Sequence, residues 1–243
     1  HPAQPHPMAR PLLRLVALLF LLGQAVLSSP AADHPNILWL VSEDNNPWLG
    51  CYGEPLARTP TLDRLAARGI RYRFAHAAAP VCAPSRSSII SGRYAPGLGT
   101  QHMRSLVPLP EGLRYFPAYL RDAGYYCTNR AKTDYNTAVP PGTWDENGNR
   151  AHWRNRPAGR PFFAVFNFGS PHESNLHERR PLQTDPAKVR VPAYLPDTPE
   201  VRADIAQYHD CHATMDGQIG EVLAELEAAG LAEDTIIFYY GDN

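Results

Sequence analysis

The chain has 243 residues, with 23 Lys and Arg against 24 Asp and Glu, so its formal net charge at pH 7 is −1. This balance lacks the basic surplus that nucleic-acid binding usually requires, and 44% hydrophobic with 19% charged residues excludes a disordered or coiled-coil chain. The length suffices for one large core, and 25 prolines, roughly twice the usual share of about 5%, indicate many loops.

Residues 1–33 have the pattern of a secretory signal peptide. Arg10 and Arg14 follow Met8, an apolar run continues to Leu27, and small residues come after it. The run is shorter than the ~20 apolar residues that a membrane span needs, so we expect a cleaved signal, with residues 1–7 upstream of the true start. The sequence thus predicts an exported protein (secreted, periplasmic or lysosomal) without stable membrane insertion.

Strand and helix patterns alternate over the remaining residues, 34–243. Short apolar runs rich in β-branched and aromatic residues predict buried strands at 37–41, 125–128, 162–168 and 236–240. Apolar spacing together with Pro and Gly positions predicts helices that begin near residues 59, 84, 116 and 199, each ending at a glycine. The alternation predicts an α/β fold with a mostly parallel central sheet sandwiched by helices. We expect 136–160 and 173–199 to be loops over the site.

Polar side chains follow each of the four predicted strands. Because ligands bind beyond the carboxyl ends of parallel strands, this layout predicts an active site at one sheet edge. The residues concerned are Glu43, Asp44, Lys132, Asp134, His172, Asp242 and Asn243.

Glu43, Asp44, Asp242 and Asn243 offer only oxygen ligands, which suit Ca²⁺ or Mg²⁺ rather than zinc. Each pair alone is more typical of a helix cap or a solvated turn. Their equivalent positions after two strands favour a metal site.

Cys82 stands just before a short helix bracketed by Pro84 and Gly92. A group there faces free backbone N–H groups and the positive end of the helix dipole, which predicts an anion pocket and a cysteine of lowered pKa. The alternative is a buried or disulfide-bonded cysteine. The other cysteines are Cys51, Cys127 and Cys211, whose pairing the sequence leaves open.

These motifs resemble the type I sulfatases. The stretch CAPSR at 82–86, followed by SGR at 91–93, is similar to the signature at which that family converts cysteine to formylglycine. Segments 35–53, 59–66, 215–216 and 241–243 are similar to its first strand and metal loop, the following helix and the second metal segment. The segment order looks most like the heparan N-sulfatase and iduronate-sulfatase members.

The resemblance implies an alkaline phosphatase/sulfatase-like fold and hydrolysis of sulfate esters or N-sulfates of glycans. It implies that a formylglycine-generating or equivalent enzyme converts Cys82, that Arg86 holds the product, and that Lys132 contacts the sulfate. It further implies that His172 lies near the leaving oxygen and that the oxygen ligands named above bind Ca²⁺, or alternatively Mg²⁺.

Three departures from the family pattern stand out. Glu43 replaces the usual Asp, and Asp134 replaces the usual His, whose imidazole His102 could supply, although a structural role is more typical of such a histidine. The chain also ends at Asn243, where family members continue, so we expect the N-terminal part of a catalytic domain, truncated before the C-terminal subdomain. We expect this piece alone to be poorly stable and inactive.

Two other functions stay open. The family shares its fold with phosphonate and phosphate monoester hydrolases, and a non-catalytic protein could bind sulfated glycans without cleaving them. The aromatic residues Tyr135, Trp144 and Trp153 could stack on sugar rings or anchor the core, and the sequence does not distinguish these roles.

Overall fold

The computed structural model describes residues 34–243, so the expected signal peptide lies outside the described residues. Within them, no helix combines the length and the apolar character needed to cross a bilayer.

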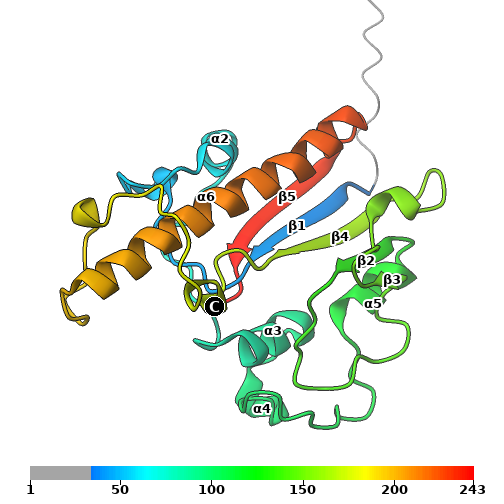
Figure 1. Ribbon diagram of the computed structural model, residues 1–243. Helices are drawn as coiled ribbons and strands as arrows, with labels where there is room; N and C mark the ends of the chain where they lie inside the picture. The colour runs from blue at the N-terminus through cyan, green and yellow to red at the C-terminus, as the bar shows by residue number, and fades with distance from the viewer. Residues whose placement is uncertain (1–33) are drawn as a thin grey trace, which may run out of the picture. The chain divides into compact units, whose positions relative to one another are not determined.

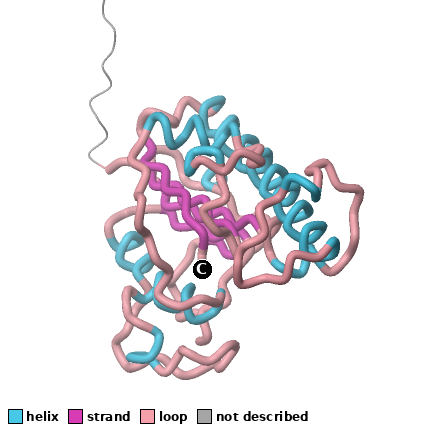
Figure 2. Tube along the Cα trace, turned by 90° about the vertical axis from the view of Figure 1, so that its left-hand side faces the viewer, coloured by secondary structure: helices cyan, strands magenta, loops and turns pink. Residues whose placement is uncertain are grey.

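Five parallel strands form one sheet in the order β3-β2-β4-β1-β5 (Figures 1 and 2). This confirms the predicted parallel sheet, with strand ends shifted by one or two residues. The strand predicted at 236–240 is not buried as expected, since Ile236 and Phe238 are 47% and 49% exposed. The strands are β1 (Asn36–Ser42), β2 (Tyr126–Arg130), β3 (Glu146–Asn147), β4 (Phe162–Phe168) and β5 (Thr235–Gly241).

Alternation along the strands sends apolar side chains to two opposite faces. On one face, Leu38 and Leu40 pack with α2 (Pro60–Arg68) and α6 (Pro199–Ala228). On the other, Val41 and Phe163 pack with α5 (Phe116–Asp122). Figure 1 shows α3 (Cys82–Ser91) and α4 (Ala95–Leu98) on the same side as α5. The predicted sandwich is confirmed.

Helix α2 begins at Pro60 as predicted, but Thr59 does not cap it with its side chain. The buried carboxylate of Asp216 on α6 accepts hydrogen bonds from the backbone N–H groups of Thr61 (3.0 Å) and Leu62 (2.8 Å) instead. These are donors that a helix start leaves unsatisfied. A long-range contact therefore does the work expected of a local cap.

The segment 136–160 is more ordered than a loop over the site. It contains β3 and a 3₁₀ helix, η2 (Trp153–Asn155), and the Trp153 ring is fully buried in the core. Tyr135 is also buried, and Trp144 stacks on Phe163 with ring centroids 5.8 Å apart. Of the two roles left open for these aromatics, core anchoring is the one observed. The remaining 3₁₀ helices are η1 (Gly50–Tyr52), η3 (Glu173–Leu176) and η4 (Pro186–Lys188).

Candidate active site

The carboxyl ends of β1 and β5 bring the two predicted ligand pairs together. The strands are adjacent and in register, with Ser42 opposite Gly241, so the residues that follow the two strands meet. The Asp44 backbone N–H donates to Asp242 Oδ1 (3.2 Å), and the Asn243 side-chain amide donates to Asp44 Oδ1 (3.0 Å). Two segments about 200 residues apart in sequence therefore form one acidic cluster.

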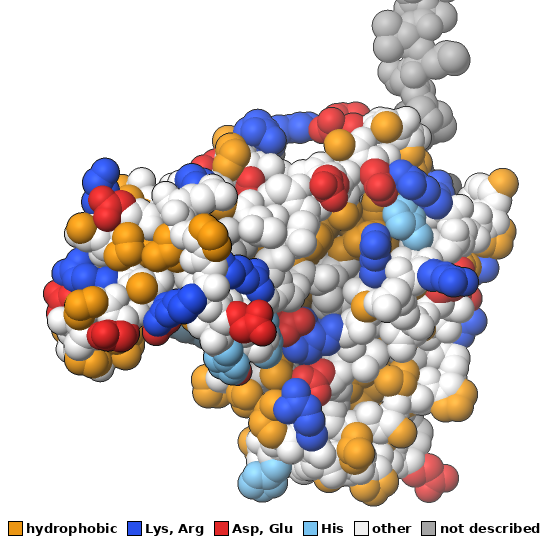
Figure 3. Space-filling view, viewed as in Figure 1, with side chains coloured by type: hydrophobic (Ala, Val, Ile, Leu, Met, Phe, Trp, Pro, Cys, Tyr) orange, Lys and Arg blue, Asp and Glu red, His pale blue; other side chains and the backbone are white. Residues whose placement is uncertain are grey.

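Two cationic side chains face this cluster from other elements. Arg86 Nε lies 2.7 Å from Asp242 Oδ2, and both side chains are almost wholly buried. The Lys132 ammonium forms an ion pair with the Glu43 carboxylate. Figure 3 shows acidic, basic and histidine side chains gathered near the middle of the viewed face. Each buried carboxylate thus has an opposite charge beside it, as burial of charge requires.

The donor set fits a hard divalent cation by its chemistry. Three carboxylates and one amide supply only oxygen, and Asn243 Oδ1 is buried with no hydrogen-bond partner. In residues 34–243, however, no group of three or more His, Cys, Asp and Glu side chains is close enough to hold a metal ion. Instead, Lys132 and Arg86 form ion pairs with two of the carboxylates that would be metal ligands, those of Glu43 and Asp242.

Cys82 is the first residue of α3, one position earlier in the helix than the sequence indicated, and its side chain is buried. Val81, the N-cap, has no side chain that caps the helix, so the N-terminus keeps donors for an anion. The prediction of a lowered pKa is wrong for the thiol. Burial raises its pKa, and a hydrogen bond with Asp134 adds to this, against a smaller lowering by Lys132.

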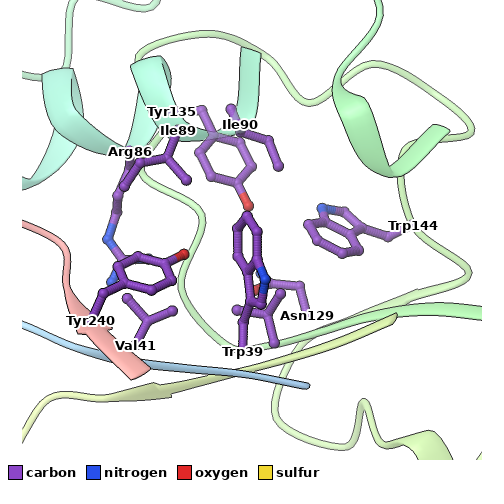
Figure 4. Close-up of a pocket in the computed structure, with 10 residues that line it drawn as sticks. Trp39, Val41, Arg86, Ile89, Ile90, Asn129, Tyr135, Trp144 and Tyr240 are labelled. Carbon is purple, nitrogen blue, oxygen red and sulfur yellow. The ribbon is translucent and has the colours of Figure 1, made fainter. Parts of the chain in front are cut away.

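Arg86 lies one helical turn after Cys82 and points from α3 toward the sheet (Figure 4). Its Nη1 donates to Asn167 Oδ1 on β4 (2.7 Å), whereas Nη2 is buried without a hydrogen-bond partner. The guanidinium borders a small cavity of about 20 Å³, enough for one water molecule, whose wall includes Trp39 and Tyr240. The ion pair with Asp242 and the hydrogen bond with Asn167 hold the arginine in place between α3 and the sheet.

Lys132 and Asp134 are held by a tight loop after β2. Ala131 and Asp134 have left-handed backbone angles (φ 97° and 53°), which are strained for residues with a Cβ. The Asn129 side chain donates to the Lys132 carbonyl (3.0 Å), which fastens the loop to the strand. Asp134 Oδ2 is buried without a hydrogen-bond partner and lies 3.9 Å from Lys132 Nζ.

The two predicted histidines have different outcomes. His172 Nε2 lies 3.8 Å from both Glu43 Oε2 and Asp44 Oδ2, so this ring is part of the cluster. His102 is exposed, and its backbone carbonyl accepts hydrogen bonds from Asn136 Nδ2 (2.8 Å) and from the Ser105 backbone N–H (3.3 Å). His102 therefore does not supply the imidazole that the family pattern has at position 134.

Three supporting residues escaped the sequence analysis. The Ser85 hydroxyl donates to the Asp242 carbonyl, Asn167 binds Arg86, and the Tyr208 hydroxyl on α6 donates to the Asp44 carbonyl (2.5 Å). Asn167 carried a usable signal because it is the polar residue inside the apolar strand FFAVFNF. The four cysteines are all free thiols, so Cys82 is buried rather than disulfide-bonded, and the other three are unpaired.

Several known proteins are similar to this chain. A family model described as Sulfatase matches residues 35–157 and 129–243. An ulvan-active sulfatase of Formosa agariphila is 36% identical over 91% of this chain and 45% of its own length. N-sulphoglucosamine sulphohydrolase of Homo sapiens is 27% identical over 97% of this chain and 55% of its own length. The chain thus spans about half the length of these curated relatives.

Solved structures share the fold. A 2-O GAG sulfatase has a TM-score of 0.70 at 19% identity, covering 86% of this chain and 58% of its own. A phosphonate monoester hydrolase from Silicibacter pomeroyi has a TM-score of 0.69 at 19% identity, covering 86% and 62%. At such identities the likeness concerns the fold alone. Because the family model matches throughout residues 35–243, the chain belongs to the sulfatase family.

Proposed function

We propose that the protein to which this chain belongs hydrolyses sulfate esters or N-sulfates of sulfated glycans. The observation that carries the proposal is the meeting of Cys82, Arg86 and Lys132 with three carboxylates at one sheet edge. The named relatives support the substrate class, since one is described as ulvan-active and another as an N-sulphoglucosamine sulphohydrolase.

The nucleophile in this proposal is formylglycine at position 82. A maturation enzyme would oxidise the Cys82 side-chain carbon by two electrons, which an external oxidant accepts, while oxygen replaces the departing sulfur. The hydrated aldehyde would supply the attacking oxygen, and Ca²⁺ or Mg²⁺ on Glu43, Asp44, Asp242 and Asn243 would polarise the sulfate. The raised pKa of the free thiol supports this choice, because the unmodified side chain is a poor nucleophile.

The chain's own residues would bind and orient the substrate. Lys132 and the N-terminus of α3 would neutralise charge on the sulfate oxygens, and Arg86 would hold the side chain at position 82. His172, whose ring lies beside Glu43 and Asp44 with part of its surface exposed, would protonate the leaving oxygen. Residues 1–33 would direct export to the compartment where such glycans occur.

One experiment tests the proposal and its alternatives. The peptide that spans Cys82 is weighed in protein expressed through its natural secretion route. We expect a mass lower by one sulfur-for-oxygen exchange and two hydrogens. The same preparation is then assayed with aryl sulfate and aryl phosphonate, with Cys82→Ala as control.

Faster turnover of the sulfate, lost in the control, supports a sulfatase. Preference for the phosphonate would assign the protein to the phosphonate hydrolases. An unmodified thiol with tight glycan binding and no turnover would overturn catalysis in favour of a binding protein.

A further inference from the structure

The loop 100–107 is hydrogen-bonded both to α3, which carries Cys82, and to the loop after β2, which carries Asp134. Thr100 Oγ1 hydrogen-bonds Ser87 Oγ on α3 (2.7 Å). Asn136, two residues after Asp134, donates from its side chain to the Thr100 carbonyl (2.7 Å), and its own carbonyl accepts from Val107 N (2.9 Å). The loop is therefore part of the frame of the site.

Within this frame the backbone of Arg104 is strained. Its φ is 53° and that of Leu106 is 50°, in the left-handed region that side-chain-bearing residues rarely occupy. Such strain costs about 1–3 kcal/mol per residue and persists where surrounding contacts over-determine it. Here the anchors on Thr100 and Asn136 provide those contacts, so the fold imposes the backbone position of Arg104.

The carboxylate of Asp134 lies between the guanidinium of Arg104 and the side chain of Cys82. Arg104 Nη2 lies 3.7 Å from Asp134 Oδ2, which is too long for a hydrogen bond, and the arginine side chain is 67% exposed. Asp134 in turn lies beside the Cys82 side chain. Among the described residues, Asp134 is the only acidic group within ion-pair distance of Arg104. Most of its five N–H donors therefore face solvent at the rim of the site.

The other two cationic side chains of the site, Arg86 and Lys132, already form ion pairs with carboxylates. Arg86 is buried on Asp242, and Lys132 lies on Glu43 with little exposure. In the proposed function these inner cations, together with a divalent ion, would neutralise the scissile sulfate. A third, exposed cation carried on a constrained backbone at the rim is therefore placed to meet a different group of the substrate.

We propose that Arg104 is a specificity-determining residue that recognises a second anionic group on the sugar beside the scissile sulfate. That group is a carboxylate or another sulfate, since both present the paired oxygens that a guanidinium binds in bidentate fashion. This inference rests on the proposed function, because it names the substrate class of the same site.

The test compares Arg104→Gln with Arg104→Lys on three probes. Phenyl sulfate carries one anionic group, 3-carboxyphenyl sulfate adds a carboxylate, and 1,3-phenylene disulfate adds a sulfate. We expect R104Q to raise KM for the two doubly anionic probes roughly tenfold or more, and R104K to retain part of the preference. The difference between these two probes identifies the source of the second charge. Phenyl sulfate should change less than threefold.

Binding to the Cys82→Ala protein gives a readout independent of turnover. Calorimetric titration of this background, with and without R104Q, should show the same loss for the doubly anionic probes alone. Equal weakening of all three probes, or a wild-type protein with no preference for a second charge, overturns the role of Arg104. Absence of turnover with the aldehyde verified overturns the proposed function instead, and the calorimetric comparison still decides the role of Arg104.

Discussion

Two buried aspartates show how the same side chain serves structure in one region and chemistry in another. Asp216, between α6 and α2, has both oxygens bound by backbone N–H groups of a helix start. Asp242, at the end of β5, is bound by the charged Arg86 and by the Asp44 backbone, next to an unpartnered Asn243 oxygen. Neutral, saturated partners mark a structural carboxylate, whereas charged partners and unpaired atoms nearby mark a site.

The largest effect is expected from removing the charged partner of Asp242. Replacing Arg86 by Gln leaves the Asp242 carboxylate buried without its positive partner, because the two side chains are 6% and 0% exposed. We expect a loss of about 3–5 kcal/mol in the free energy of unfolding, measured by urea denaturation. The matched control is Arg114→Gln, whose pair with Asp122 is exposed to solvent, so its loss should be far smaller. Equal losses in both variants would contradict the distinction.

Asp216→Asn tests the aspartate with neutral partners, whose carboxylate accepts from two backbone N–H groups. An amide cannot accept from both N–H groups of α2 without turning its NH₂ toward one of them, so we expect a loss of about 2–3 kcal/mol. Turnover by the folded fraction should be unchanged, unlike in the Arg86 variant. The control is Asp204→Asn on the same helix, whose carboxylate is 42% exposed beside Arg179. A fall in turnover with unchanged stability would place Asp216 in the site.

The pH dependence of stability sharpens the contrast on α6. His212 is fully buried, and burial, followed by repulsion from His209, lowers its pKa from 6.5 to about 4. Above pH 6.5 the ring is neutral in both states. As the pH falls toward 4, the unfolded chain binds a proton that the folded chain does not, so stability is lost.

Between pH 7 and pH 5 we expect His212 to account for about 2 kcal/mol of that loss. His212→Phe should remove this share in urea titrations at the two pH values, and His177→Phe, at an exposed ring, should leave it intact. An unchanged pH slope in His212→Phe would refute the assignment.

The smallest effect is expected at the contact between Gly241 and Asn45, next to the proposed metal ligands. A Cβ at Gly241 would stand 2.8 Å from the Asn45 carbonyl oxygen, so Gly241→Ala must displace the residues after Asp44. If the ligands are as proposed, calorimetry should show Ca²⁺ binding weakened about tenfold. Gly217→Ala, in open space on α6, is the control and should not affect binding. Unaltered affinity in Gly241→Ala would argue against this edge as the metal site.

Local pattern accounts for most of what could be foreseen about the fold. Alternating strands and helices, with Pro and Gly at helix ends, indicated the parallel sheet because these signals act over a few residues. The cap of α2 could not be foreseen, since its acceptor, Asp216, lies some 155 residues away. The burial of Trp153 escaped for the same reason, because proline- and glycine-rich flanks conceal a core residue whose partners lie on β4.

The sequence by itself determined which chemistry-bearing residues follow the strands, since parallel strands deliver their carboxyl ends to one edge. Only the tertiary structure decided their partners: Lys132 on Glu43, Arg86 on Asp242, Asp134 against Cys82, and Arg104 rather than His102 at the rim. The direction of the Cys82 pKa shift was decided there too. Desolvation and ion pairing depend on what surrounds a group in space, which spacing along the chain does not encode.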